Sequence, residues 1–360
     1  MAAPMTDAGG SPRRREPFSY RIVHSFPKPP EERAWREFLE RADLPSHYVA
    51  PEYFLEPYWA KTPPFAVLAV DGSKVAAVLT GTHEGNETVS GNPCRPQTCF
   101  DPATDYSRAT NALARGLLAE AGSAELVTVF AWAQIEGLSR TGFLPCALTG
   151  VVMLDLRQGL DVLFQQLHAS RRRNVRHAAK LGVEVFEAAT EEDVAAYYDV
   201  YCRWRRTPRK TIPMGQLPPS VFAEAYKLRD NRRLFLARHG GRIIAGVTVR
   251  FQRGGLLQNQ ESASLDEYLH LRPNDLLLWK TIEWGHAEGF SRYSLEGAHT
   301  FFRRMGGSVV PVYRHRLDRT WLRRHDLREA MERHGVTRVM LPLMRGVLRG
   351  GRALRRGLTG

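Results

Sequence analysis

The sequence predicts an α/β protein with two similar domains in tandem, each built on a mixed sheet flanked by helices. The chain has 360 residues, enough for two domains of about 150 residues each. Hydrophobic residues make up 43% and charged residues 25%, which is ordinary for a folded protein. The same order of elements (helix, hairpin, helix, strand) occurs twice along the chain, and this repeat is the main evidence for two domains.

The first copy of this order begins with a helical pattern at residues 30–43, whose apolar side chains share one face. A β-hairpin follows, with Asp71 and Gly72 at its turn. Residues 106–121 then have the pattern of a helix, and residues 125–132 that of an apolar strand.

The second copy has clearer boundaries. Its long helix starts with Pro273 near the first helical position and ends at Gly289, as helices commonly do. Its hairpin turns at Gly240 and Gly241. The predicted helix, hairpin, third strand, long helix and closing strand lie at residues 191–206, 233–251, 254–264, 273–289 and 291–297.

Composition marks the ends of the chain and the link between the copies. The first residues are rich in small side chains, Pro and Arg and lack the apolar core of a signal peptide. A strand at residues 151–156 and a basic helix at residues 161–181 join the two copies. We therefore expect a disordered leader at 1–17, a degenerate first domain at 18–156, a basic linking helix and strand at 157–185, a second domain at 186–320 and a basic amphipathic tail at 321–360.

The net charge of +13 is concentrated near the C-terminus, where residues 311–360 contain 13 Arg and four acids and carry +9. Such a balance favours phosphate-bearing ligands, nucleic acid or anionic membrane surfaces. Residues 336–358 mix Val, Met and Leu with Arg, which fits either an amphipathic helix on anionic lipid or a disordered basic tail.

No apolar run approaches the roughly 20 residues of a membrane span. We therefore expect a cytoplasmic protein that can lie peripherally at the inner face of the membrane. The four cysteines contain no CxxC pair, and no His or Cys cluster has zinc-ligand spacing. Reduced thiols and no metal are expected.

Two stretches of the second half resemble a known family. Residues 167–185 (LHASRRRNVRHAAKLGVEV) resemble the basic helix and following Gly-Val strand of Fem-type peptidyl transferases and CelD/BioF-like acetyltransferases. Residues 269–313, with Pro-Asn-x-Leu-Leu opening a helix and a Phe-rich segment ending in Gly, resemble the C-terminal core of the same proteins. The resemblance covers residues 18–316, and it implies two tandem GNAT-like domains, one of them degenerate.

The resemblance also implies a function. Such a protein moves an acyl or aminoacyl group from acyl-CoA or aminoacyl-tRNA, used as a co-substrate, to an amine or hydroxyl. The expected acceptor is a small-molecule or lipid-linked cell-envelope precursor or a glycan, held in the cleft between the halves. No tightly bound cofactor is expected, and tRNA is the expected macromolecular partner if the donor is aminoacyl-tRNA.

The chain departs from this family at the donor site. The R/QxxGxG/A loop that binds pyrophosphate through backbone amides is absent from both halves, and the second half offers only Arg272 and Asn274 before its long helix. The family's FKxxFG segment is FFRRMG here, so Phe302 occupies the lysine position. Arg303 or Arg304 is then the candidate cation at the reacting group.

Arginines of the basic helix are candidates for phosphate binding, because pairs one turn apart suit bidentate contact. The alternative is a solvated helix face, which is what charge runs usually form. These candidates are Arg171, Arg172, Arg173 and Arg176.

Consecutive polar residues, Gln258 to Glu261, interrupt what should be a central strand. Alternation would send Gln258 and Gln260 to one face and Asn259 and Glu261 to the other. Gln258 is a candidate substrate ligand, and a half-buried Glu261 could act as general base; the alternative is an edge strand with a solvated face.

Glu296 ends the last strand, at the sheet edge where α/β proteins usually bind ligands. It is a second candidate catalytic carboxylate, and the alternative is an exposed strand end.

Two functions of other classes remain open. A degenerate GNAT-like domain can be a non-catalytic binding module. The basic tail could instead bind nucleic acid, although the chain has no helix-turn-helix, zinc or RNP-type motif and its tail arginines are not interleaved with aromatics. For that reason DNA is not an expected partner.

Overall fold

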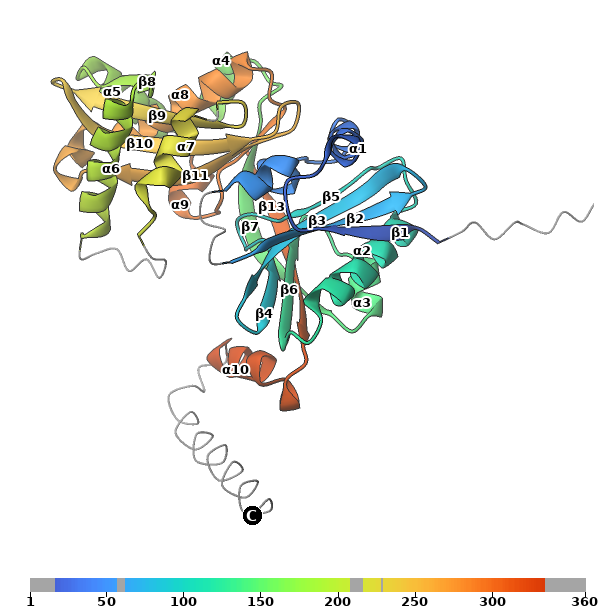
Figure 1. The fold of residues 1–360 in the computed structure, drawn as a ribbon. Coiled ribbons are helices and arrows are strands. Elements are labelled where there is room, and N and C mark those ends of the chain that lie inside the picture. The colour runs from blue at the N-terminus through green and yellow to red at the C-terminus, as the bar shows by residue number, and fades with distance from the viewer. Residues whose placement is uncertain (1–16, 57–61, 208–215, 228, 334–360) are drawn as a thin grey trace, which may run out of the picture.

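The computed structural model describes residues 17–56, 62–207, 216–227 and 229–333 (Figure 1). Residues 1–16 of the predicted leader and residues 334–360 of the predicted tail lie outside these residues. Within them the chain forms two α/β halves, as predicted, and no described helix is long and apolar enough to span a bilayer.

The N-terminal half places helices on both faces of its strands. Helices α2 and α3 cover one face through an Ala- and Leu-rich core, and α1 covers the other around Trp35 and Phe38. The strands are β1 (Ser19–Val23), β2 (Pro64–Asp71), β3 (Lys74–Glu84), β4 (Glu87–Ser90), β5 (Thr98–Phe100) and β6 (Leu126–Ala131). The helices are α1 (Pro29–Leu39), α2 (Tyr106–Ala121), α3 (Glu136–Arg140) and the 3-10 turns η1 (His47–Val49) and η2 (Pro51–Leu55).

The C-terminal half repeats this three-layer plan (Figure 1). Helices α5 and α8 cover one face of the sheet, and α6 and α7 cover the other. Its strands are β8 (Glu184–Glu187), β9 (Arg232–His239), β10 (Arg242–Phe251), β11 (Leu256–Ser264) and β12 (Arg292–Ser294). Its helices are α4 (Leu160–Gln166), α5 (Ala169–Lys180), α6 (Glu191–Arg205), α7 (Pro219–Lys227), η3 (Asp266–Leu271), α8 (Pro273–Ala287) and α9 (Thr300–Arg303).

Strand pairing confirms the repeat. In the N-terminal half β2, β3 and β4 are antiparallel and β4 pairs parallel with β6. In the C-terminal half β9, β10 and β11 are antiparallel and β11 pairs parallel with β12. The predicted hairpin turn at Gly240 and Gly241 is present, with φ of 55° and 77°, a conformation that glycine adopts without strain.

Two long strands join the halves into one 13-stranded sheet, whereas the sequence predicted separate sheets. β7 (Leu144–Asp155) pairs with β12 at one end and with β13 (Ser308–Asp318) along most of its length. β13 then continues along β6, so the last strand of the chain returns to the N-terminal half. Gly150 permits the close approach of β7 and β13, because a Cβ there would meet Val310 O at 1.9 Å. The chain continues into the turn η4 (Trp321–Arg323) and helix α10 (Arg324–Arg333).

The prediction of a single basic helix at residues 161–181 is wrong, because the structure has two helices there, α4 and α5. The chain is extended at Leu167 (ψ 137°), which buries its side chain in the core below α8. The His168 side chain then caps α5 by accepting a hydrogen bond from Ser170 N. The helix is therefore interrupted at Leu167, and the interruption lets this apolar side chain be buried in the core.

β11 and β12 separate at their carboxyl ends. They pair only from Leu256 to Gln258, after which β11 follows β10 to Ser264. The chain after Ser294 stays with β7 instead, because Leu295 N donates to Val152 O. This opening in the sheet lies at the junction of the two halves.

Candidate functional site

Two adjoining cavities occupy the opening between β11 and β12. The larger, of about 700 Å³, lies between the halves. The smaller, of about 200 Å³, lies within the C-terminal half between β10, β11, α8 and α9. Asn259 and Phe302 line both cavities, so the two spaces meet at these side chains.

Glu296 is a buried carboxylate that lines the larger cavity. It follows β12 in a left-handed conformation (φ 55°), and its side chain is only 5% exposed. Its Oε2 accepts a hydrogen bond from Arg95 Nε at 2.6 Å, while its Oε1 has no hydrogen-bond partner among the described residues. Burial raises the pKa of Glu296 to about 7, although Arg95 opposes the shift. A carboxylate with this pKa can accept a proton near neutral pH.

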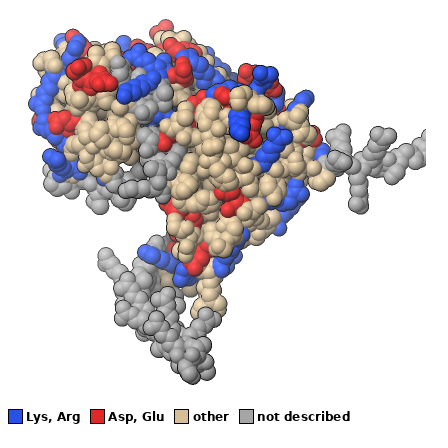
Figure 2. Space-filling view, in the orientation of Figure 1, with Lys and Arg blue, Asp and Glu red and all other residues tan. Residues whose placement is uncertain are grey.

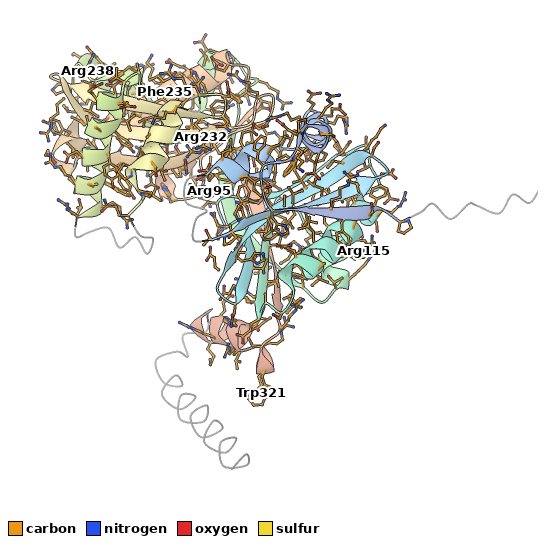
Figure 3. The ribbon with its side chains drawn as sticks, viewed as in Figure 1. Arg95, Arg115, Arg232, Phe235, Arg238 and Trp321 are labelled. Carbon is orange, nitrogen blue, oxygen red and sulfur yellow. The ribbon has the colours of Figure 1, made fainter. Side chains whose placement is uncertain are left out.

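Arg95 comes from the N-terminal half, in the loop between β4 and β5 (Figure 3). The side chain of Asn92 accepts hydrogen bonds from Cys94 N and Arg95 N and so fixes this loop. Arg95 Nη2 also donates to Gln260 O at 2.8 Å. Arg95 was not predicted from the sequence, because its partners lie far along the chain and no local pattern marks it.

Glu261 lines the larger cavity beside Glu296. Burial raises its pKa, and Arg95 and Arg205 oppose the shift. The predicted alternation of side chains along this strand is wrong at Gln260. Thr248 of β10 pairs with Glu261 and Val249 with Asn259, so Gln260 is the extra residue of a β-bulge. The bulge lets three consecutive residues, 259–261, line one cavity.

Gln258 is fully buried and is not among the described residues that line the two cavities. It lies opposite Arg250 of β10, next to a charged cluster that the sequence analysis missed. Glu56 Oε1 lies 2.5 Å from His47 Nε2, 3.2 Å from Arg250 Nε and 3.5 Å from Arg232 Nη2, and all four side chains are fully buried. Burial raises the pKa of Glu56, but Arg250 and the other two partners outweigh it and hold this pKa well below its usual value.

The predicted donor ligands Arg272 and Asn274 lie at the start of α8. Arg272 adopts the left-handed conformation that opens the helix. Asn274 lines the smaller cavity and donates from Nδ2 to Ser264 Oγ at 3.1 Å. The positive end of the α8 dipole thus faces this cavity, and a buried acid, Asp275, shares the first turn.

The four arginines predicted to bind phosphate have separate surroundings on α5. Arg171 Nη1 pairs with Asp275 at 2.7 Å, and its guanidinium lies over Phe301 at the edge of the smaller cavity. Arg172 donates to two backbone carbonyls at the end of α4, and Arg176 lies over Phe164. Arg173 is exposed. None of the four is among the described residues that line the two cavities.

The predicted cations Arg303 and Arg304 are exposed on α9 and just after it. Arg303 Nε donates to Ala298 O, and neither arginine is among the described residues that line the two cavities. Phe302 lines both cavities instead and packs against His299, with ring centroids 4.0 Å apart. No cluster of described His, Cys, Asp and Glu side chains could hold a metal ion.

This arrangement of two three-layer halves, with a sheet that opens between parallel strands, defines a tandem GNAT fold. Residues 166–304 match the family model described as acetyltransferase (GNAT) domain, so the C-terminal half contains a GNAT-type domain. No curated protein matches the chain.

Solved structures share the fold at low sequence identity. The chain is similar to FemX, with a TM-score of 0.61 and 12% identity, covering 82% of this chain and 96% of that one. It is similar to the C-terminal domain of a putative lysylphosphatidylglycerol synthetase from Agrobacterium fabrum (TM-score 0.57, 11% identity, 84% of this chain and 96% of that one). It is also similar to a tandem GNAT protein from the clavulanic acid biosynthesis pathway (TM-score 0.52, 12% identity, 84% and 99%). The predicted Fem-like tandem GNAT fold is confirmed.

Proposed function

We propose that this protein transfers an acyl or aminoacyl group from an activated donor to an amine, with Glu296 as general base. The observation that carries the proposal is the unpartnered Oε1 of Glu296, on a buried carboxylate with a pKa of about 7 that lines the larger cavity. Two other buried carboxylate oxygens of the described residues, Glu52 Oε2 and Glu56 Oε2, also lack a partner, but of these three carboxylates only Glu296 lines the cavity.

The acceptor is proposed to bind in the larger cavity. Three carboxylates line it (Glu84, Glu261 and Glu296) against one described arginine, Arg95. This balance favours a positively charged group such as an ammonium over a neutral hydroxyl, because opposite charges attract strongly where water is scarce. A lipid-linked or soluble cell-envelope precursor or a glycan carrying an amine has the required chemistry.

The donor is proposed to enter through the smaller cavity. Its walls include Val247, Leu277 and Leu278, which suit an acyl chain, and the N-terminus of α8 suits a phosphate of the donor. Asn259 stands where the cavities meet. Its Oδ1 accepts from Tyr293 OH, so its Nδ2 is the atom that can donate to a carbonyl oxygen as negative charge develops there.

The reaction then follows from these positions. The ammonium loses one proton to Glu296 Oε1, and the freed nitrogen lone pair attacks the donor carbonyl carbon. A C–N bond forms, and the C–S bond of a thioester or the C–O bond of an aminoacyl ester breaks. The leaving sulfur or oxygen takes the second nitrogen proton. Acyl-CoA is a thioester and aminoacyl-tRNA is an ester, so both can take part in this exchange of bonds and protons. A cytoplasmic protein has access to both donors.

The test offers the protein a panel of acyl-CoAs and aminoacyl-tRNAs with amine acceptors and follows transfer by mass spectrometry. Transfer by the wild type and its loss by about 10²-fold or more in Glu296→Gln support the proposal. Full activity in Glu296→Gln contradicts it. Binding of a donor without transfer to any acceptor would instead support a non-catalytic binding module.

A further inference from the structure

Three residues that line the larger cavity each carry a buried polar atom without a hydrogen-bond partner among the described residues. These atoms are Glu296 Oε1, Gln260 Oε1 and the Tyr48 hydroxyl. Other buried atoms in the described part of the chain also lack a partner, but none of them belongs to a residue that lines either cavity. Buried polar groups are normally paired, so three such atoms around one cavity indicate a ligand that supplies the partners. The proposed function uses Glu296 Oε1 and leaves the other two without a role.

The charges of this cavity differ from those of the surface. On the face shown in Figure 2, basic and acidic side chains are interspersed over both halves. The described lining of the larger cavity has three carboxylates against one arginine, Arg95, which already donates to Glu296 and to Gln260 O. A free carboxylate on the ligand would be repelled here. The group that meets Tyr48 and Gln260 is therefore neutral.

Tyr48 is held beside the ion pair of Glu296 and Arg95. It lies in η1, where its backbone O accepts from Thr80 Oγ1 at 2.5 Å and its ring packs edge-on against His47, with centroids 5.1 Å apart. The Arg95 guanidinium lies 5.6 Å from the centre of the Tyr48 ring. Burial raises the pKa of the Tyr48 phenol well above its ordinary value, Arg95 opposes this shift and Glu296 adds to it. The hydroxyl thus keeps its proton at neutral pH and can donate a hydrogen bond.

Gln260 supplies the complementary acceptor. It is the extra residue of the β-bulge, and its backbone O accepts from Arg95 Nη2, so the residue is fixed at the cavity. Its Oε1 can only accept. A hydroxyl accepts and donates through the same oxygen, so one hydroxyl of a ligand can satisfy both Tyr48 and Gln260. A carbonyl or ether oxygen would leave Gln260 Oε1 without a partner.

We propose that the acceptor is an amino alcohol, with its hydroxyl on the carbon next to the one that bears the amine. Tyr48 donates to the hydroxyl oxygen, the hydroxyl donates to Gln260 Oε1, and the amine meets Glu296. Arg95 contacts all three residues, so the two groups of the acceptor bind close together. The cavity of about 700 Å³ holds a molecule of the size of an amino sugar. This inference rests on the proposed function for the amine and adds the group that selects the acceptor.

The experiment compares four probes of one shape: 2-aminocyclohexanol, cyclohexylamine, 2-aminocyclohexanecarboxylate and 2-aminocyclohexanecarboxamide. It measures kcat/KM for transfer and the Kd of each probe by NMR titration. The wild type is expected to prefer the amino alcohol to cyclohexylamine about 100-fold or more, because a site built to bind a hydroxyl discriminates strongly against its absence.

Two variants test the assigned side chains. Tyr48→Phe and Gln260→Leu should each lower this preference about tenfold or more and leave the constants for cyclohexylamine unchanged. A merely structural role would lower both acceptors alike. Tyr106→Phe is the matched control and should keep the full preference, because the Tyr106 hydroxyl donates to Gln134 O and Tyr106 is not among the described residues that line the two cavities.

The proposed function and this inference fail in different ways. Transfer to cyclohexylamine and its loss in Glu296→Gln report the proposed function, whereas the ratio between the two acceptors reports the inference. Without transfer, the ratio of the Kd values still gives the answer. Equal constants for amino alcohol and cyclohexylamine, or a preference that both Tyr48→Phe and Gln260→Leu retain, would overturn the inference. A preference for the carboxylate or carboxamide probe, or binding of none of the four, would overturn it as well.

Discussion

Glu296 and Arg95 form an ion pair across the cleft although 201 positions separate them in the chain. The carboxylate follows the last core strand of the C-terminal half, and the guanidinium comes from a loop of the N-terminal half. The pair therefore places a charge from the N-terminal half at the centre of the candidate site.

Removing the Arg95 charge should raise the pKa of Glu296 above about 7, because Arg95 stabilises the ionised form, whereas burial and the Glu261 charge both raise this pKa. We predict this upward shift for Arg95→Met and a value near that of the wild type for Arg95→Lys. The measurement is a ¹³C NMR titration of labelled Glu side chains. An unchanged pKa in Arg95→Met would mean that the ion pair is not formed in solution.

Glu56→Gln should destabilise the protein by about 3–5 kcal/mol at pH 7, because it removes the buried carboxylate that pairs with Arg232 and Arg250. The folded-state pKa of Glu56 lies below its ordinary 4.5, so its contribution is present above that pH and is lost as pH falls. The gap between variant and wild type should narrow at pH 3. Urea unfolding measures both effects.

The matched control for that variant is Glu32→Gln, whose ion pair with Arg36 is partly exposed. It should cost less than about 1 kcal/mol. Equal costs for the two variants would contradict the account of the buried cluster.

Local patterns predicted the elements that depend on local residues. The turn at Gly240 and Gly241 and the start of α8 at Pro273 were predictable because turn and helix-start chemistry act within a few residues. The position of Glu296 near a strand end could be predicted in the same way, because it depends on local sequence. Ligands of α/β proteins commonly bind at such strand ends, so Glu296 was a candidate site residue on the sequence alone.

The remaining features depend on contacts between distant segments. The bulge at Gln260 is set by the register against Thr248 and Val249, which no pattern within β11 contains. The pairing of β13 with β6 joins the first and last parts of the sheet, and Arg95 meets Glu296 only because the halves pack together. One sequence holds no signal for such partners.

Ser262→Trp should block the smaller cavity, since Ser262 is an exposed residue of its lining and a bulky side chain there costs little folding energy. We predict a rise of about tenfold or more in the donor KM, with an unchanged melting temperature, from lost space for the acyl group. Lys280→Trp, at an exposed position of α8 outside this lining, is the control. Equal KM values in both variants would place the donor elsewhere.

Arg172→Ala/Arg176→Ala tests the predicted phosphate role of α5. If these arginines bind a phosphate of the donor, affinity measured by calorimetry should fall by up to several kcal/mol, at ~1.5–3 kcal/mol for each charge-assisted hydrogen bond. A small loss of stability, about 1 kcal/mol, is also expected, because Arg172 donates to carbonyls at the end of α4. An unchanged donor affinity in the double variant would mean that these side chains only pack against α4.

The central claim is that Glu296 accepts the proton of the acceptor amine, and the pH dependence of kcat/KM tests it most directly. Because the base must be ionised and its pKa is about 7, kcat/KM should fall as pH drops below about 7, approaching tenfold per unit. In Glu296→Gln the residual rate should lack this fall at low pH. Glu261→Gln should keep the fall but move it to lower pH, because the Glu261 charge helps to raise the pKa of Glu296. A limb near pH 7 that persists in Glu296→Gln, or a wild-type limb near the ordinary glutamate value, would contradict the account.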